Sequence, residues 1–218
     1  MSAWLTVAGL LPTLLFAAVT TVEITAGAFV LALLIGMVGA VMQTLRSRMV
    51  RGLVAVYVDV FRAVPVLTQL FIIYFGLSDL GIRLDPLPAA IIGFGIYGGA
   101  SMIEVFRAGI ESVDHGQMEA AQMIGMTRLH AMRLVVLPQA MRVVLPPLGN
   151  FVIGLLKDTA IASAVAAPEL MFRAKNLVDK TFLSSQIYLT VAAIYLAMSL
   201  PLSRLTRMAE ARAARGRG

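Results

Sequence analysis

Residues 119–138 read EAAQMIGMTRLHAMRLVVLP, a mixed-charge stretch between two long apolar runs. Glu119–Met123 are good helix formers, and Gly125 suits the left-handed position at which a helix ends. Thr127 can cap a second short helix, and Pro138 is expected to stop or redirect the chain. The stretch therefore predicts two short helices joined by a sharp turn, which would protrude from the apolar part of the protein.

The chain on either side of this stretch has the composition of an all-α integral membrane protein. Of its 218 residues, 59% are hydrophobic and only 14% are charged, and its mean hydropathy is +0.87. Because a hydrocarbon core of roughly 30 Å needs about 20 apolar residues per helix, this length allows about five spans. We expect no separate soluble domain. We expect no cleaved signal peptide either, because the apolar N-terminus lacks a preceding basic region.

The apolar runs divide into five predicted spans within one transmembrane domain, residues 1–218. The first run is too long for one span, so residues 3–17 are expected to form a separate outer helix. Pro65 should kink the second span, and the third contains IIGFGIYGGAS, whose small residues let helices approach closely. The predicted spans are about 20–44, 53–77, 87–107, 140–158 and 187–204, and the insert between the third and fourth covers 112–137.

The basic residues predict which side of the membrane each loop faces. Alternating spans place the 46–51 segment, the insert and the C-terminal tail on one side. That side carries Arg46, Arg48, Arg51, Arg107, Arg128, Arg133, Arg142, Arg204, Arg207, Arg212, Arg215 and Arg217, whereas the other carries Arg83, Arg173, Lys175 and Lys180. By the positive-inside rule the first side is cytoplasmic, so the N-terminus lies outside and the insert faces the cytoplasm.

Several classes of function have no support in the sequence. The chain has no Cys, which excludes disulfides and thiolate chemistry. His115 and His130 lack the spacing of metal ligands, so no metal site is expected. No HExxH, GxSxG or GxxxxGK[ST] motif is present. The net charge of +6 is explained by membrane topology, so we expect a lipid environment and no nucleic-acid partner.

The surface of the predicted insert combines charged and apolar residues. Glu119, Arg128 and Arg133 surround apolar positions such as Ile124 and Leu129. This mixture suits docking into a groove of another protein. An ordinary amphipathic cytoplasmic loop explains it equally well.

The insert also resembles a known family, the permease subunits of bacterial ABC importers. Their signature is E-A-A, three residues, G, nine residues and I-x-L-P. This chain has Glu119-Ala120-Ala121, Gly125 at the expected distance, and a final Leu137-Pro138, with valine in place of isoleucine. The stretches at 58–77, 103–121 and 155–170 are similar to the polar amino-acid branch of that family, so the resemblance runs from about Thr20 to Leu205.

This resemblance implies a five-span permease in the bacterial cytoplasmic (inner) membrane. Such a chain would work with a dimer of ATPase subunits, a second identical or related permease, and an external solute-binding protein. It would import a polar amino acid or a similar zwitterion. The partner ATPase would bind ATP and Mg, so this chain would hold no cofactor and would not be an enzyme. The residues implied in ATPase coupling are Glu119, Ala120, Ala121, Gly125, Leu137 and Pro138.

Polar residues within the spans are candidates for the substrate pathway, because such groups are costly in lipid. Asp158 could pair with a substrate ammonium, and Lys157 or Thr159 with its carboxylate. A structural role at a helix break remains open for Lys157 and Asp158. The further candidates are Asn150, Glu104, Ser101 and Gln69, for which gating or interhelical hydrogen bonding is an equal alternative. Asp59 and Arg62 are expected to pair with each other.

One other class of function would also explain five spans that contain polar residues. An ion-coupled secondary transporter or a channel is the alternative to an ABC permease. Many secondary transporters contain inverted internal repeats, and none is detected in this sequence. That class also offers no reason for the E-A-A insert.

Overall fold

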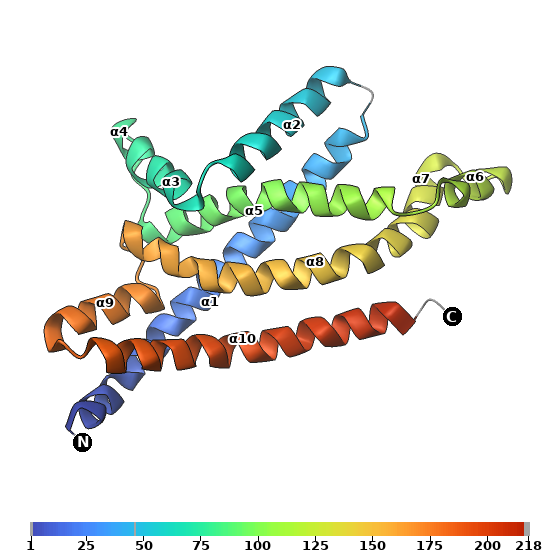
Figure 1. Ribbon diagram of the computed structural model, residues 1–218. Helices are drawn as coiled ribbons and strands as arrows, with labels where there is room; N and C mark the ends of the chain where they lie inside the picture. Colours follow the sequence, from blue (N-terminus) through green and yellow to red (C-terminus); the bar gives the residue numbers. More distant parts are fainter. Residues whose placement is uncertain (1, 46, 216–218) are drawn as a thin grey trace.

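The computed structural model describes residues 2–45 and 47–215, and every regular element within them is helical (Figure 1). Helices suit this apolar chain because they satisfy every backbone hydrogen bond internally, where lipid offers no partners. By length and composition, four helices among the described residues can cross a membrane, and a bent helix pair there can supply a fifth span. The all-α membrane class is thereby confirmed. The four are Ala3–Gln43, Pro86–Glu111, Arg128–Val165 and Ser184–Arg212, and the bent pair is Arg48–Ala63 with Val66–Asp79.

The N-terminal run forms one helix, α1 (Ser2–Gln43), so the expected separate helix over residues 3–17 is wrong. Pro12 lies inside α1 without ending it. Its residues Val7 and Leu14 are buried in an apolar cluster with residues of two C-terminal helices, α9 (Leu170–Thr181) and α10 (Ser184–Arg215). This packing explains why the helix continues, since proline removes only one backbone donor.

Close packing of α1 against α5 (Pro86–Glu111) forms the centre of the fold. A Cβ added at Gly36 of α1 would lie 2.3 Å from the Met102 Cβ, and one added at Gly99 of α5 would lie 2.5 Å from an Ile35 methyl group. The two backbones could not approach this closely with larger residues at these positions. The glycine-rich part of the third predicted span therefore has the role expected from the sequence.

The second span is broken into two arms. The first is α2 (Arg48–Ala63), and the second joins α3 (Val66–Phe71), a π-helical turn (Ile72–Gly76) and α4 (Leu77–Asp79). The arms meet at an angle of 106° at Val64 and Pro65. Proline has no N–H to continue the helical ladder, so the kink predicted at Pro65 is a sharp corner.

From Arg128 in the second part of the insert, the chain forms one continuous helical stretch. It comprises α7 (Arg128–Ala131), a π-helical turn (Met132–Val136), α8 (Leu137–Asp158) and a 3₁₀ turn (Thr159–Val165). α10 packs beside α8, and α9 packs against α1 and α10. An apolar core containing Phe94, Leu155 and Leu70 lies between α5, α8 and α3.

The elements separate into two ends along the long axis of the molecule (Figure 1). The end of α1, the start of α2, the end of α10 and α6 (His115–Met123) lie at one end, whereas the start of α1, α4 and α9 lie at the other. This arrangement agrees with the alternation used to place the basic segments. We call the end with α6 the insert end and the opposite one the α9 end.

Candidate functional site

The insert contains a short helix ended by a glycine turn. Asp114 begins α6 by accepting a 2.6 Å hydrogen bond from the Gly116 amide. Gly125 has φ +88°, a left-handed conformation that glycine adopts without a steric penalty. The Gly125 and Met126 amides donate back to the Gln122 and Ala121 carbonyls at 2.9 and 3.1 Å. The predicted helix and its left-handed end are therefore confirmed.

The second part of the insert differs from the prediction. The Thr127 hydroxyl oxygen accepts a 3.3 Å bond from the His130 amide, so the predicted cap is correct. However, the helix that begins there continues through the π-helical turn into α8. Pro138 lies in the first turn of α8 and does not stop the chain. Its missing N–H is tolerated because it falls where the helical hydrogen-bond pattern changes.

The E-A-A motif divides between the surface and the interior. Glu119 and Ala120 are exposed, whereas Ala121 is buried. Gly125, Leu137 and Pro138 are exposed as well. Ala121 therefore packs inside this chain and is not available for contact with another protein.

The tip of the insert carries a cluster of exposed apolar side chains. Met123 is 87% exposed, and Ile124 and Leu129 are each 77% exposed. An apolar patch at a protruding tip is typical of a surface that a partner covers. We refer to these three residues as the insert tip.

The insert contacts the helix bundle through a hydrogen bond, and a hollow lies between the insert and the bundle. The Gln139 side-chain nitrogen of α8 donates a 3.2 Å bond to the side-chain Oε1 of Gln117 in α6. A hollow of about 280 Å³ lies between the end of α1, the end of α5 and the insert. Its lining residues are Thr44, Ile110, Val113, Asp114, His115, Met118, Arg128, Met132 and Val136. Within the described residues, no group of three His, Asp or Glu side chains could hold a metal ion.

One face of α8, within the candidate span Arg128–Val165, presents polar side chains. Asn150 and Lys157 lie seven residues apart, about two helical turns, and both are exposed. An unpaired cation facing lipid is costly, so this face is suited to a polar cavity or another subunit. Asp158 is half-buried and points about 100° around the helix from Lys157. Lys157 and Asp158 therefore do not face one point.

Thr159 does not share that face. It is completely buried, and its hydroxyl donates a 2.8 Å bond to the Leu156 carbonyl at the end of α8. This contact adds a side-chain donor to a carbonyl where the α-helix changes to a 3₁₀-helix. The structure gives Thr159 a structural contact.

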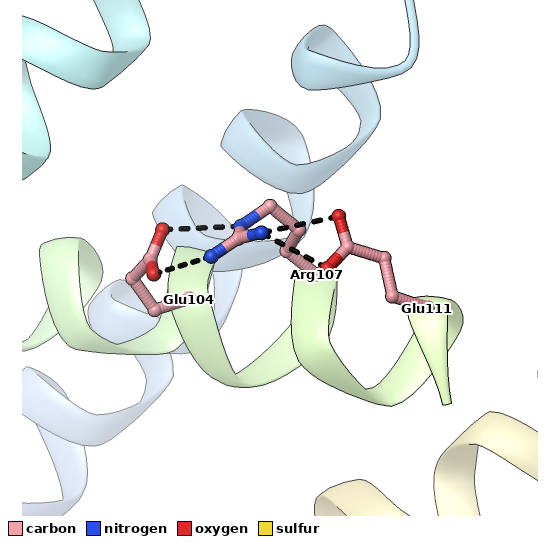
Figure 2. A network of polar contacts seen from close by, with 3 residues as sticks. All are labelled: Glu104, Arg107 and Glu111. Atoms are coloured by element: carbon pink, nitrogen blue, oxygen red, sulfur yellow. Dashed lines mark hydrogen bonds and ion pairs between the residues drawn. The ribbon is translucent and has the colours of Figure 1, made fainter.

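Glu104 belongs to an ionic network that runs along α5. Figure 2 shows the Arg107 guanidinium between the carboxylates of Glu104 and Glu111. The ion pairs measure 2.7 Å to Glu104 and 2.9 Å to Glu111. Ser101 lies one turn before Glu104 and is half-buried. The spacing of Arg107 from both acids was visible in the sequence, although the sequence analysis did not identify this network.

Gln69 supports the corner between α2 and α3. It is buried, and its side-chain nitrogen donates to the Phe61 carbonyl at 2.8 Å and to the Val64 carbonyl at 2.7 Å. These are carbonyls near the break in the helix, where the regular ladder is interrupted. Asp59 and Arg62 make no ion pair with each other in the described residues, so that expected pair is wrong.

A buried carboxyl that the sequence analysis did not single out joins three helices. Glu169 accepts hydrogen bonds from the Met171 and Phe172 amides at 2.8 and 2.7 Å, which caps α9, and from the Tyr195 hydroxyl at 3.2 Å. The Thr21 hydroxyl oxygen of α1 accepts the Leu170 amide at 3.1 Å. Burial raises the pKa of Glu169 to about 7. Its position directly before an apolar helical run was the available signal.

Comparisons with known proteins agree with this geometry. Residues 32–215 match the family model described as "Binding-protein-dependent transport system inner membrane component". The chain is 40% identical over 178 residues to the probable glutamine ABC transporter permease protein GlnM of Bacillus subtilis, covering 82% of this chain and 81% of that protein. It is 36% identical to the L-cystine transport system permease protein TcyB of the same organism, covering 88% and 82%.

Solved structures show the same fold. A crystal structure of an amino acid ABC transporter with histidines superimposes with a TM-score of 0.90 at 34% identity, covering 96% of this chain and 98% of that one. The MetNI methionine ABC transporter, in an inward-facing conformation, matches with a TM-score of 0.72 at 18% identity, covering 94% and 95%. The chain belongs to the family of binding-protein-dependent transport system inner membrane components: it is a permease subunit of an ABC transporter, located in the bacterial inner membrane, and not an enzyme.

Proposed function

We propose that this permease imports an amino acid or a similar zwitterion, with energy supplied by separate ATPase subunits. Its relatives are named for glutamine and cystine, and another, NocM of Agrobacterium fabrum, for nopaline. All three named substrates carry both ammonium and carboxylate groups. A pathway for them needs polar contacts within the membrane, which the open face of α8 can supply.

The observation that carries the coupling role is the exposed apolar insert tip. On the topology predicted from the basic residues, it lies on the cytoplasmic side, where an ATPase dimer would cover it. Glu119 and Ala120 border the contact, and Gly125 sets the turn that presents it. Leu137 and Pro138 connect the insert to α8, whereas Ala121 holds α6 against its own chain. ATP and Mg would be bound entirely by the ATPase.

Substrate contacts are proposed for Asn150, Lys157 and Asp158. Asn150 and Lys157 are exposed on one face of α8, which would form one wall of a substrate cavity. Asp158 lies at the edge of that face and could reach the same cavity. A second permease subunit would close that cavity from the other side. Ser101 and the paired Glu104 would lie nearer the insert end, where Glu104 serves as a gate. Gln69 and Thr159 support the helices that form the cavity.

The coupling role is tested with Gly125→Arg in proteoliposomes that contain the ATPase, both permease subunits and the solute-binding protein. An L-residue at φ +88° is strained, and an arginine at the turn would obstruct docking of the tip. We expect ATP-driven amino-acid uptake to fall by at least tenfold, with membrane insertion unchanged.

Gly52→Arg is the matched control. Gly52 also has nothing within 4 Å of an added Cβ, but its φ lies outside the left-handed range. It lies near the start of α2, at the same end of the molecule. Uptake by this control should equal that of the unchanged protein. Normal uptake by Gly125→Arg would contradict the coupling role. Uptake that continues without ATP and stops when ion gradients are collapsed would instead support a secondary transporter.

A further inference from the structure

A polar pocket lies at the α9 end of the molecule, opposite the insert end (Figure 1). Its volume is about 460 Å³. α9 supplies most of the lining, and α1 contributes one residue. The lining residues are Thr13, Arg173, Asn176, Leu177, Asp179 and Lys180. None of them was assigned to coupling or to the substrate pathway.

The two cations of this pocket lie on one face of α9. Arg173 and Lys180 are seven residues apart, which is two helical turns and about 10 Å along the axis. Asn176 lies between them on the same face. Lys175, in contrast, projects from the opposite side of the helix. The pocket therefore presents two positive charges at a defined separation.

Three contacts hold this face in place. Leu170 and Ala174 are completely buried in the cluster that joins α9 to α1 and α10. The Glu169 carboxylate caps the start of the helix through the Met171 and Phe172 amides. Because α9 is fixed at its start and along its inner face, a partner would meet a preformed surface and would not have to order it.

The charges on this face are available to a partner. Arg173 and Lys180 are both exposed, and neither makes an ion pair with another residue in the described parts of the chain. On the predicted topology, the pocket opens to the outside of the cell membrane. Two unpaired cations there would attract an anionic surface and speed its approach.

The mixture of groups favours a protein over a phospholipid as the partner. Asp179 places a carboxylate at the edge of the pocket, and Asn176 and Thr13 add groups that both donate and accept hydrogen bonds. A carboxylate would repel a lipid phosphate. It would, however, pair with a basic or hydroxyl group on a protein that also carries acidic residues.

We infer that the Arg173–Lys180 face of α9 is a docking surface for acidic side chains of the extracytoplasmic solute-binding protein. The inference rests on the proposed function, because it names the surface that receives that partner. Two carboxylates on the binding protein about 10 Å apart would match the two cations. Asp179 would pair with a basic group on the same surface of the binding protein. This third contact would fix where the binding protein sits along α9.

The test uses the whole transporter in nanodiscs. The probe is the loaded solute-binding protein whose addition stimulates ATP hydrolysis by the unchanged complex. The double variant Arg173→Gln/Lys180→Gln should raise the concentration of binding protein needed for half-maximal stimulation by about tenfold, with the maximal rate unchanged. Added salt should weaken the unchanged complex more than the double variant.

Lys175→Gln is the control, since it removes one cation from the other side of the same helix. It should leave the half-maximal concentration within about twofold. An unchanged concentration in the double variant would overturn the inference, while stimulation of the unchanged complex would still support the proposed function. If removing anionic lipid abolishes stimulation in the unchanged complex and in Lys175→Gln but has no effect in the double variant, the α9 face binds lipid instead and the inference is overturned.

Discussion

At the scale of single residues, the structure separates side chains that share one motif. Glu119 and Ala120 are exposed and Ala121 is buried, although all three belong to the same E-A-A motif. Successive residues on a helix point about 100° apart, so a motif of three must divide between faces. Which residue points inward depends on where α6 lies against α7 and the turn that follows it.

Glu169 gives a pH-dependent prediction at this scale. Burial raises the pKa of its carboxyl from the ordinary 4.5 to about 7, although the Met171 and Phe172 amides, Tyr195 and the Lys175 charge oppose that rise. The folded protein therefore holds this proton more tightly than the unfolded chain. The group's stabilising contribution is complete below pH 4.5 and is lost as the pH rises to about 7.

A pKa difference of this size corresponds to about 3 kcal/mol of unfolding free energy. We expect the thermal unfolding temperature in detergent to fall between pH 4.5 and about 7. Glu169→Gln should remove that fall, because glutamine keeps a hydrogen-bonding group but does not titrate. Glu119→Gln, at an exposed position, should retain it. The same pH profile in Glu169→Gln as in the unchanged protein would refute the assignment.

At the scale of elements, the second span depends on a side chain that bridges its corner. Gln69 lies in α3, and both of its donated bonds reach carbonyls of the chain just before that helix, Phe61 and Val64. Proline at the corner explains the break. Gln69 explains why a break inside a candidate span is tolerated, since it satisfies carbonyls that lipid cannot.

Replacing Gln69 by leucine tests this role. Leucine keeps similar bulk but leaves the two carbonyls without these donors, so we expect a loss of about 1–3 kcal/mol in unfolding free energy. Gln117→Leu removes an exposed hydrogen bond to Gln139, and its effect should stay below about 0.5 kcal/mol. Equal thermal unfolding curves for the two variants would show that Gln69 is not needed at the corner.

At the scale of the whole molecule, the two ends carry separate tasks. The insert tip lies at one end and the cationic face of α9 at the other, with the packed α1 and α5 helices between them (Figure 1). This separation allows one chain to contact partners on both sides of the membrane. The prediction depends on which end faces the cytoplasm.

The absence of cysteine from the sequence permits a direct test of sidedness. Single cysteines at exposed Ser47 and Ser112 should be protected from a membrane-impermeant maleimide in intact cells. Cysteines at exposed Arg83 and Ser184 should react. Disrupting the membrane should make all four react, and the opposite pattern in intact cells would reverse the topology.

The sequence by itself determined the membrane class, the glycine-rich contact of the third span, and the helix ends at Gly125 and Thr127. These features depend on composition or on hydrogen bonds within a few residues, so local chemistry is sufficient. Only the tertiary structure decided that α1 is continuous through Pro12, that Pro138 lies in the first turn of α8 and does not stop the chain, and that Ala121 is buried. It also brought Thr21, Glu169 and Tyr195 together from three helices. These features depend on contacts between segments far apart in the chain, and the free energy of such packing outweighs local preferences at a proline or a polar residue.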